Sequence, residues 1–216
     1  MSASRRDPAP TRRDEHVADT RQALVDAARK LFTDQGYAAT GTEEIVAAAR
    51  VTRGALYHHF RDKTDLFRAV MEQVAREVAE DLISAGMPGP GPGSGSGTAS
   101  AGGAWDEVRE GLRAFLDLCV VTDDFQRIVL VEGPAVLGHE AWDDLVARHG
   151  SNLLAEWLSR AVEEGSIAPV PVQPLTRLLI AMIAESSLYI ARAADRSAAR
   201  DEMGVVLGRL LDGLAA

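Results

Sequence analysis

Hydrophobic residues recur at every third or fourth position through most of the 216-residue chain, with polar residues between them. This spacing places hydrophobic side chains on one face of a helix, and the two-residue alternation of strands is almost absent. The predicted helices span residues 19–35, 42–49, 52–60, 63–84, 105–119, 125–131, 139–164, 175–194 and 197–214. We therefore predict an all-α fold, in which Gly133-Pro134 must break or kink the helix that begins at Phe125.

Two short helices joined by a tight turn are predicted between residues 42 and 60. Thr42 and Thr52 stand where each helix begins, and a threonine hydroxyl there accepts a backbone N–H from the next turn. Arg50 and Val51 form the break between them. The second helix carries outward side chains that no core requires, namely Arg53, Gly54, Tyr57 and His58. This layout predicts a helix-turn-helix motif, which places its second helix in the major groove of DNA.

The same stretch resembles the N-terminal domain of TetR/AcrR-type transcriptional regulators, over roughly residues 18–72. The matching positions are Thr42, Ile45, Ala49, Val51, Thr52, Gly54, Leu56, Tyr57, His59, Phe60, Lys63 and Leu66. The chain departs from the family at Arg50, where a glycine usually stands in the turn. A left-handed backbone there costs an arginine on the order of 1 kcal/mol.

The expected DNA-binding residues are Thr42, Thr52, Arg53, Gly54, Ala55, Tyr57, His58, His59 and Lys63. We assign base reading to Arg53, whose guanidinium can bond the O6 and N7 edge of guanine. Gly54 and Ala55 allow the helix to lie close to the bases. The residues expected to hold phosphates and fix the docking angle are Thr42, Tyr57, His59 and Lys63. His58 suits either role.

Three parts are predicted along the chain. Residues 1–18 form a disordered tail, residues 19–66 form the three-helix DNA-binding domain, and residues 67–216 form a helical domain for effector binding and dimerisation. Within the last part, residues 86–103 are rich in Gly, Pro and Ser and are predicted to form a flexible loop. The tail carries two arginine pairs, which either stay in solvent or reach into the minor groove as an arm.

The last two predicted helices carry more hydrophobic residues than one face holds. In the first of them, one flank comprises Leu175, Leu179, Ile183 and Ile190, and the other Leu178, Met182 and Tyr189. A helix that is apolar on two flanks must bury both. Either the domain has a single thick core or, as the resemblance implies, these helices pair with a second copy as a four-helix bundle. A homodimer also suits a palindromic double-stranded DNA operator, whose half-sites lie about 34–36 Å apart.

The resemblance further implies that a small molecule binds the C-terminal domain, tilts the helix from Lys63 and releases the DNA. The Ala- and Leu-rich composition of this domain favours an apolar effector. The candidate effector-binding residues are Phe115, Phe125, Trp142, Trp157, Met182, Glu185 and Tyr189. Aromatic side chains inside a helical domain are also ordinary core residues. The Glu185 carboxylate either meets the effector or pairs with Arg192 or with the partner subunit.

The net charge of −9 is divided unevenly along the chain. Residues 1–71 hold 12 Lys and Arg against 10 Asp and Glu, whereas residues 72–216 hold 11 against 22. A slightly basic front end fits an approach to phosphates, and an acidic remainder fits a part of the chain that stays away from DNA.

Other classes of protein find little support in the sequence. The N-terminus lacks the apolar segment of a signal peptide, and no run of 18 apolar residues occurs, so we expect a cytoplasmic protein that does not span a membrane. A lone cysteine, Cys119, fits a reducing compartment. His139-Glu140 resembles the start of a zinc-binding motif, but Asp143 stands where the second histidine would be. We therefore expect no metal, no cofactor and no enzymatic activity.

We predict a DNA-binding transcriptional repressor that a small-molecule effector releases from its operator. Two alternatives stay open. One is an activator or co-effector-dependent regulator of the same fold, and the other is a helical binding module that has no operator. The donor-rich outer face at Arg53, Tyr57 and Lys63 argues against the second alternative.

Overall fold

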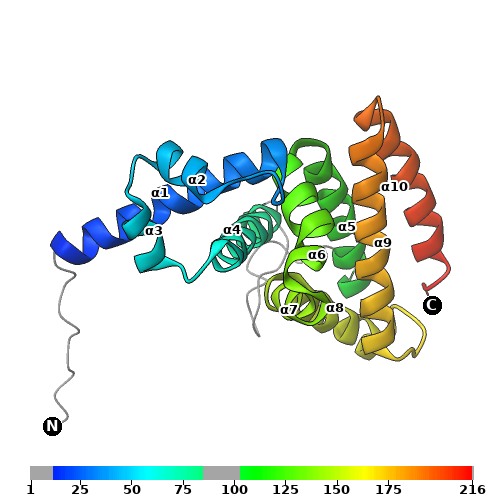
Figure 1. Ribbon diagram of the computed structural model, residues 1–216. Coiled ribbons are helices and arrows are strands. Elements are labelled where there is room, and N and C mark those ends of the chain that lie inside the picture. The colour runs from blue at the N-terminus through cyan, green and yellow to red at the C-terminus, as the bar shows by residue number, and fades with distance from the viewer. Residues whose placement is uncertain (1–11, 85–102, 216) are drawn as a thin grey trace, which may run out of the picture. The chain divides into compact units, whose positions relative to one another are not determined.

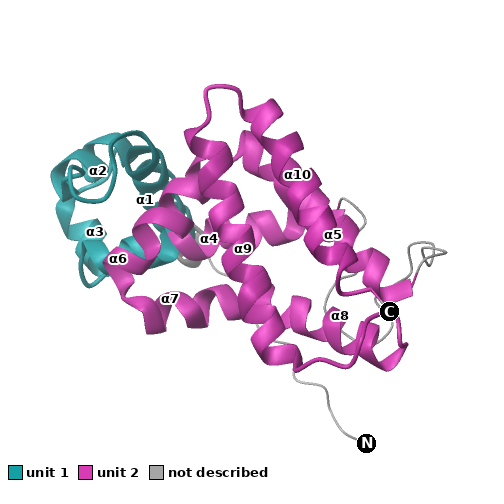
Figure 2. Ribbon diagram, turned by 90° about the vertical axis from the view of Figure 1, so that its right-hand side faces the viewer, with its two compact units in different colours: residues 1–70 teal, residues 71–216 magenta. Residues whose placement is uncertain are grey.

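The computed structural model describes residues 12–84 and 103–215, and the chain divides into two compact units between Val70 and Met71 (Figures 1 and 2). All the regular elements in these ranges are helices, and the one β contact there is an isolated bridge between Ile167 and Ala215. The predicted all-α fold is therefore confirmed. The division falls after Val70, whereas the sequence placed the domain boundary after Leu66.

The first unit contains three helices and the start of a fourth. They are α1 (Arg12–Gln35), α2 (Thr42–Ala49), α3 (Arg53–His59) and the first residues of α4 (Lys63–Ser84). Their hydrophobic stripes meet in a core whose fully buried members include Leu24, Phe32, Ile45, Leu56, Leu66 and Phe67. The rings of Phe32 and Phe67 pack edge to face with their centroids 5.3 Å apart, a favoured arrangement for aromatic pairs.

The helix α1 begins earlier than the sequence pattern indicated. We expected it to start at Asp19 after a disordered tail, but residues 12–18 are already helical. Arg, Glu and Ala in this stretch are strong helix formers, and no proline stands between Pro10 and Asp19. The helix can therefore extend toward the N-terminus as far as Arg12. The remainder of the expected tail lies outside the described residues. At the other end, Gly36 follows α1 with φ 86°, the predicted stop.

The turn between α2 and α3 has the backbone that the sequence predicted, with one exception. Arg50 ends α2 in the left-handed region, at φ 57° and ψ 37°. Thr52 caps α3, and its hydroxyl accepts the Ala55 N–H at 3.2 Å. Thr42 does not cap α2, because Gly41 holds the extended N-cap position and Thr42 is the first helical residue. The flexible backbone of Gly41 permits this shift by one residue.

The second unit is built around α5 (Gly103–Val121), which packs against three later helices (Figure 1). These are α8 (Asn152–Glu163), α9 (Val172–Arg192) and α10 (Arg196–Asp212). The core between them includes Trp105, Leu112, Trp157, Leu158, Leu179 and Leu211. Gly103 begins α5, whereas the rest of the expected loop at residues 86–103 lies outside the described residues.

Two wide π-helical turns interrupt the helices between α5 and α8. The π-helix η1 (Phe125–Glu132) leads directly into α6 (Gly133–Leu137), and η2 (Ala147–Ser151) joins α7 (His139–Val146) to α8. A break or kink was expected at Gly133-Pro134, and the helix changes there from π to α, with Pro134 in the first turn of α6, where its missing N–H is not needed. The single helix predicted over residues 139–164 consists of the three segments α7, η2 and α8. The π turn of η2 changes which side chains of α7 and α8 share one face.

Gly133 is required by the close packing of this region. A Cβ atom at Gly133 would lie 2.8 Å from Trp142 Cδ1, 3.1 Å from Met71 Sδ and 3.2 Å from the Ile128 carbonyl oxygen. Cβ atoms do not tolerate a contact of 2.8 Å, so any larger residue must displace the indole. The glycine therefore serves close approach rather than the termination of a helix.

Arg50→Gly should raise the free energy of unfolding by about 0.5–1 kcal/mol, because glycine adopts the left-handed backbone without the steric cost that a Cβ atom incurs. Urea unfolding followed by circular dichroism measures the change. Arg50→Ala is the control, since it removes the guanidinium but keeps the Cβ, and it should give no gain. A gain of the same size in Arg50→Ala would assign the effect to the side-chain charge instead.

Candidate nucleic-acid interface and internal cavity

The helix α3 presents one face to the core and the opposite face to solvent. Leu56 and Phe60 are buried on the inner side, and Thr52 fixes the start of the helix. Arg53, Gly54, Tyr57 and His58 are all exposed, as the pattern predicted. A Cβ atom at Gly54 would meet only Thr52 Oγ1, at 3.8 Å, so nothing inside the chain requires a glycine there. Ala55 and His59 are half-buried at the edge of this face.

Arg53 is held in a defined position by two neighbours. Its Nη1 lies 2.5 Å from Oε1 of Glu43 on α2, and its guanidinium lies over the Tyr57 ring at 5.5 Å from the centroid. Both members of the ion pair are about two-thirds exposed, and exposed pairs contribute at most about 1 kcal/mol. The pair can therefore orient Arg53 and still be exchanged for another acceptor.

Lys63 makes contacts that the sequence did not reveal. Its ammonium donates to the Tyr37 carbonyl at 2.9 Å and to the Thr40 carbonyl at 3.0 Å, and it lies 4.1 Å from the centroid of the Tyr37 ring. The start of α4 is thus tied to the turn between α1 and α2. Two of the three ammonium donors are engaged, and the phosphate contact expected of Lys63 stays a prediction.

The two adjacent histidines of α3 have different surroundings. The imidazole of His58 is exposed, and the two rings pack edge to face with centroids 5.2 Å apart. Partial burial, with smaller effects from His58 and Arg21, lowers the pKa of His59. His59 is therefore uncharged at neutral pH and suits a neutral hydrogen bond better than a charged contact. Thr42, another expected phosphate contact, is half-buried and is the first residue of α2.

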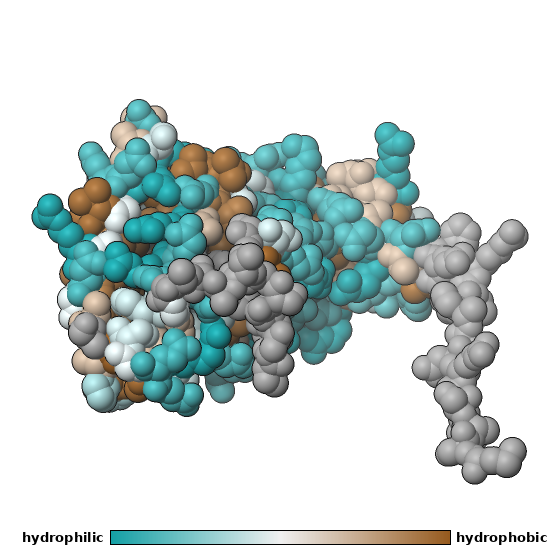
Figure 3. Space-filling model, turned by 180° about the vertical axis from the view of Figure 1, so that it is seen from behind, coloured by the Kyte–Doolittle hydropathy of each residue, from teal (hydrophilic) through white to brown (hydrophobic). Residues whose placement is uncertain are grey.

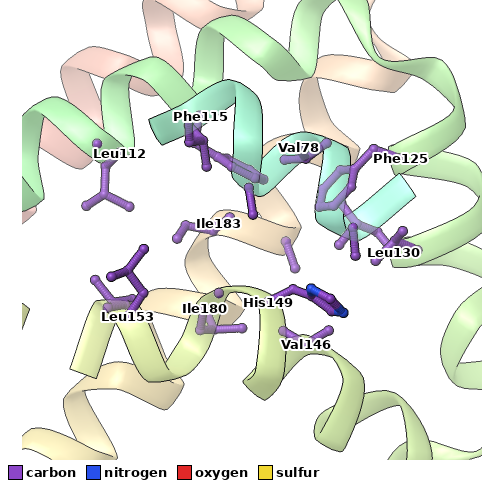
Figure 4. A pocket seen from close by; sticks show the side chains of 18 of the residues that line it. Val78, Leu112, Phe115, Phe125, Leu130, Val146, His149, Leu153, Ile180 and Ile183 are labelled. Atoms are coloured by element: carbon purple, nitrogen blue, oxygen red, sulfur yellow. The ribbon is translucent and has the colours of Figure 1, made fainter. Parts of the chain in front are cut away.

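The second unit contains an apolar cavity of about 140 Å³, which is partly open to solvent (Figure 4). Its walls come from α4, α5, η1, α7, η2, α8 and α9. The lining residues labelled in Figure 4 are Val78, Leu112, Phe115, Phe125, Leu130, Val146, His149, Leu153, Ile180 and Ile183. All of these but His149 are hydrocarbon side chains. The arrangement can hold an apolar molecule and shield it from water.

Four of the seven candidate effector residues lie together around this cavity, namely Phe115, Phe125, Trp142 and Trp157. Phe115 and Phe125 pack edge to face with centroids 5.6 Å apart. The Trp142 indole N–H donates to the Val129 carbonyl at 2.7 Å, so its one polar group is already bonded.

The other three candidates lie elsewhere. Met182 packs against the core between α5, α8 and α10. Glu185 is exposed, and within the described part of the chain it makes no ion pair with Arg192. The Tyr189 hydroxyl donates to Glu202 on α10 at 3.0 Å. The sequence placed these three on the cavity side because the flanks of α9 cannot be assigned to neighbours from spacing alone.

His149 is the ionisable residue of the cavity wall, and sequence reasoning missed it. Desolvation, reinforced by the positive charges of Arg148 and Arg76 and opposed by Glu72, lowers the pKa of its imidazole. The signal available in the sequence was its position three residues after Val146 and four before Leu153, which places it on the same apolar stripe.

The helices α9 and α10 leave large hydrophobic side chains in solvent. Leu178, Tyr189, Val205, Val206 and Leu210 are between 46% and 64% exposed. Of the described helices, α9 alone has the length and mean hydropathy, 1.3, that a membrane span needs, and 28% of that window is buried. Core helices of other proteins pass the same two criteria. Figure 3, which shows one face, likewise shows apolar patches that interrupt the polar surface of the second unit.

Comparison with known families gives two matches that together cover most of the chain. Residues 24–70 match the model described as bacterial regulatory proteins, tetR family. Residues 105–214 match the model of the tetracyclin repressor-like C-terminal domain. The first match covers α2, α3 and the second half of α1, and the second covers the helices from α5 to α10.

Among individual relatives, HTH-type transcriptional regulator AcrR of Shigella flexneri is 44% identical over 66 residues, which is 31% of each chain. The Transposon Tn10 TetC protein of Escherichia coli is 46% identical over 59 residues, 27% of this chain and 30% of that protein. The aligned segment therefore spans less than a third of the length of these relatives.

Solved structures extend the similarity to the whole chain. The crystal structure of a TetR-family transcriptional regulator from Pectobacterium atrosepticum is 32% identical, with a TM-score of 0.71, over 96% of this chain and 98% of that one. A putative tetR family regulator from Shewanella sp. PV-4 shares the fold at 19% identity, with a TM-score of 0.72, over 91% and 98%.

Lys63→Met should lower the free energy of unfolding by about 1–2 kcal/mol, because two carbonyls lose a charged donor. Chemical denaturation measures the loss. Lys30→Met is the matched control, since Lys30 is the other lysine of the chain and its exposed side chain pairs only with Asp34. If both variants were equally stable, Lys63 would not anchor α4.

Proposed function

Because this chain belongs to the tetR family of bacterial regulatory proteins, we propose that it represses transcription by binding operator DNA and that a small molecule in its internal cavity releases it. The observation that carries this proposal is the outer face of α3. Its donors point to solvent because Leu56 and Phe60 anchor the opposite face in the core. The family model of bacterial regulatory proteins, tetR family, matches residues 24–70, which include this helix.

Arg53 is proposed to read a base in the major groove. A short helix whose outer face carries a guanidinium, a phenol and an imidazole fits the groove and supplies donors for acceptor edges. Contact between the guanidinium and Tyr57 limits the rotamers of Arg53 before DNA arrives. The open space around Gly54 leaves room for the bases to approach the backbone.

A homodimer is proposed to present two such helices to a palindromic operator. The exposed apolar side chains of α9 and α10 give each copy a face that a second copy can cover. Burying apolar area stabilises association by about 25 cal/mol per Å² before the entropic costs of binding are met. The same pairing explains why so apolar a helix as α9 is little buried within a single chain.

Release is proposed to act through α4. This helix begins at Lys63, which is tied to the turn between α1 and α2, and its later residues Ala75, Val78 and Leu82 line the cavity. A molecule in the cavity that favours a different position of α4 changes the spacing of the two reading helices. Linkage then requires the molecule to bind the released form more tightly than the DNA-bound form.

The proposal as a whole is tested by footprinting the intergenic DNA next to the gene of this protein, with and without a panel of metabolites. We expect one protected palindromic region, and its loss with at least one compound. Protection that no compound removes would leave a regulator without the proposed release, and no protection at all would favour a binding module without an operator.

Arg53→Ala should weaken binding to the operator by about 1–3 kcal/mol and relax the preference at one base position per half-site. Fluorescence anisotropy with a set of single-base operator variants measures both effects. Arg53→Lys is the control, because lysine keeps the positive charge but lacks the two parallel N–H donors of the guanidinium. It should keep the salt dependence of binding and lose the base preference. A uniform loss across all operator variants would make Arg53 a phosphate contact.

Leu210→Glu should convert the dimer into a monomer at micromolar concentration, because a carboxylate would be buried without a partner in the α9 and α10 interface. Sedimentation velocity measures the state. Val121→Glu is the matched control, since Val121 is 74% exposed at the end of α5, and it should leave a dimer. A Leu210→Glu protein that stays dimeric would place the interface elsewhere.

A further inference from the structure

We propose that the cavity takes a small uncharged ring compound with one hydroxyl group, whose ring lies among the hydrocarbon side chains and whose hydroxyl bonds the imidazole of His149. This inference rests on the proposed function, because it names the class of molecule for the same cavity. It concerns binding alone and can be tested without DNA.

The size of the cavity sets the size of the ligand. Its volume is about 140 Å³. An apolar cavity of about 150 Å³ in another protein holds one benzene molecule. A single six-membered ring with a small substituent therefore fills the space.

The walls set the apolar character of the ligand. Side chains from several helices surround the space, and Figure 4 shows Ile180, Ile183, Leu153 and Phe125 around it. A charged group transferred into such surroundings loses its hydration without a compensating partner. The cavity thus selects against carboxylates, phosphates and ammonium groups.

His149 sets the position of a single polar group. Its imidazole extends among the apolar lining side chains (Figure 4). Among the residues that the structure describes, the imidazole has no hydrogen-bond partner. The indole N–H of Trp142, another polar group of the wall, already donates to the Val129 carbonyl. The half-buried His149 imidazole can therefore bond one polar group of a ligand whose remainder lies in the cavity.

The charge state of His149 favours a hydroxyl over other polar groups. Its pKa is lowered first by burial and then by the cations of Arg148 and Arg76, against an opposing effect of Glu72. Arg148 itself pairs with Glu72 at 3.4 Å. The imidazole is therefore neutral at pH 7, with one nitrogen that donates and one that accepts. A hydroxyl can serve either nitrogen, whereas an anion can only accept from the single N–H of the neutral ring.

The two π-helical turns explain why there is room beside His149. Phe125, Val129 and Leu130 of η1 and His149 and Gly150 of η2 all line the cavity. A Cβ atom on Gly150 would meet nothing within 4 Å. Single π turns within α-helices recur at functional sites. Here they widen two of the helices that line one space.

The test compares phenol with toluene, which have nearly the same shape and differ in the hydroxyl. Isothermal titration calorimetry on the full-length protein at pH 7 measures both affinities. His149→Leu should weaken phenol binding about five- to tenfold, the usual effect of one hydrogen bond, and change toluene binding by less than about twofold. His139→Leu is the matched control, since His139 is exposed in the same unit, and it should change neither affinity.

His149→Gln keeps a hydrogen-bonding group and should recover part of the phenol affinity, which also covers the case in which His149→Leu does not fold. Benzoate is the third probe and should bind more weakly than phenol. An unchanged ratio of phenol to toluene affinity in both His149 variants would overturn the proposal, as would benzoate binding tighter than phenol.

One further outcome has a structural location. A second hollow of about 390 Å³ shares Trp142, Val146 and Ile180 with the cavity and includes Arg177. Benzoate binding that is tightest of the three and lost in Arg177→Ala would place an anionic ligand there instead. Failure of these probes, together with DNA release by some other compound, would contradict this inference and leave the proposed function standing. Phenol binding through His149 without any effect on DNA binding would support this inference and contradict the proposed release of DNA.

Discussion

The burial of one side of α3 is the interaction on which the rest of the structure depends. Leu56 is fully buried and Phe60 nearly so, and full burial of a leucine side chain contributes about 1.5–3 kcal/mol. That contribution fixes the rotation of a helix only seven residues long, too short to be stable alone in water. Because the inner face is fixed, the direction of Arg53, Tyr57 and His58 is fixed with it.

The surroundings of α3 reinforce this orientation with polar contacts at its ends. Thr52 satisfies a backbone N–H at the start of the helix, and Arg50 supplies the left-handed turn that precedes it. Lys63 then ties the following helix to the turn after α1. The outer face of α3 is thus positioned by elements on each side, and α4, which follows it in the chain, continues as a wall of the apolar cavity. One continuous α4 therefore belongs to both of the proposed binding events.

The sequence was sufficient for most of the fold of the first unit. Hydrophobic spacing located the helices, and local chemistry predicted the cap at Thr52, the strained turn at Arg50 and the stop at Gly36. These features depend on neighbours within one or two turns, which the sequence displays directly. The start of α1 was missed because the basic and acidic residues before Asp19 suit a helix and a solvated tail equally well.

The remaining features depend on contacts that spacing cannot show. Lys63 bonds two backbone carbonyls, and backbone acceptors carry no signature in the sequence. The π turns shift the register of a helix, so a stripe drawn through residues 139–164 with a constant period assigns neighbours incorrectly. Met182, Glu185 and Tyr189 were proposed as effector residues because the flanks of α9 cannot be assigned to neighbours from spacing alone. His149 was not recognised although it lies on the apolar stripe. Four aromatic candidates line the cavity because large apolar side chains near the middle of a helical domain converge on its interior.

The central claim is that two copies of α3 read DNA as a symmetric pair, and selection of binding sites from a pool of random-sequence duplexes tests it most directly. The account predicts enrichment of one inverted repeat whose half-site centres lie one helical turn apart, about 34–36 Å, with guanine at a fixed position in each half. A pool that shows no enrichment, or enrichment of a single unrepeated site, would contradict it.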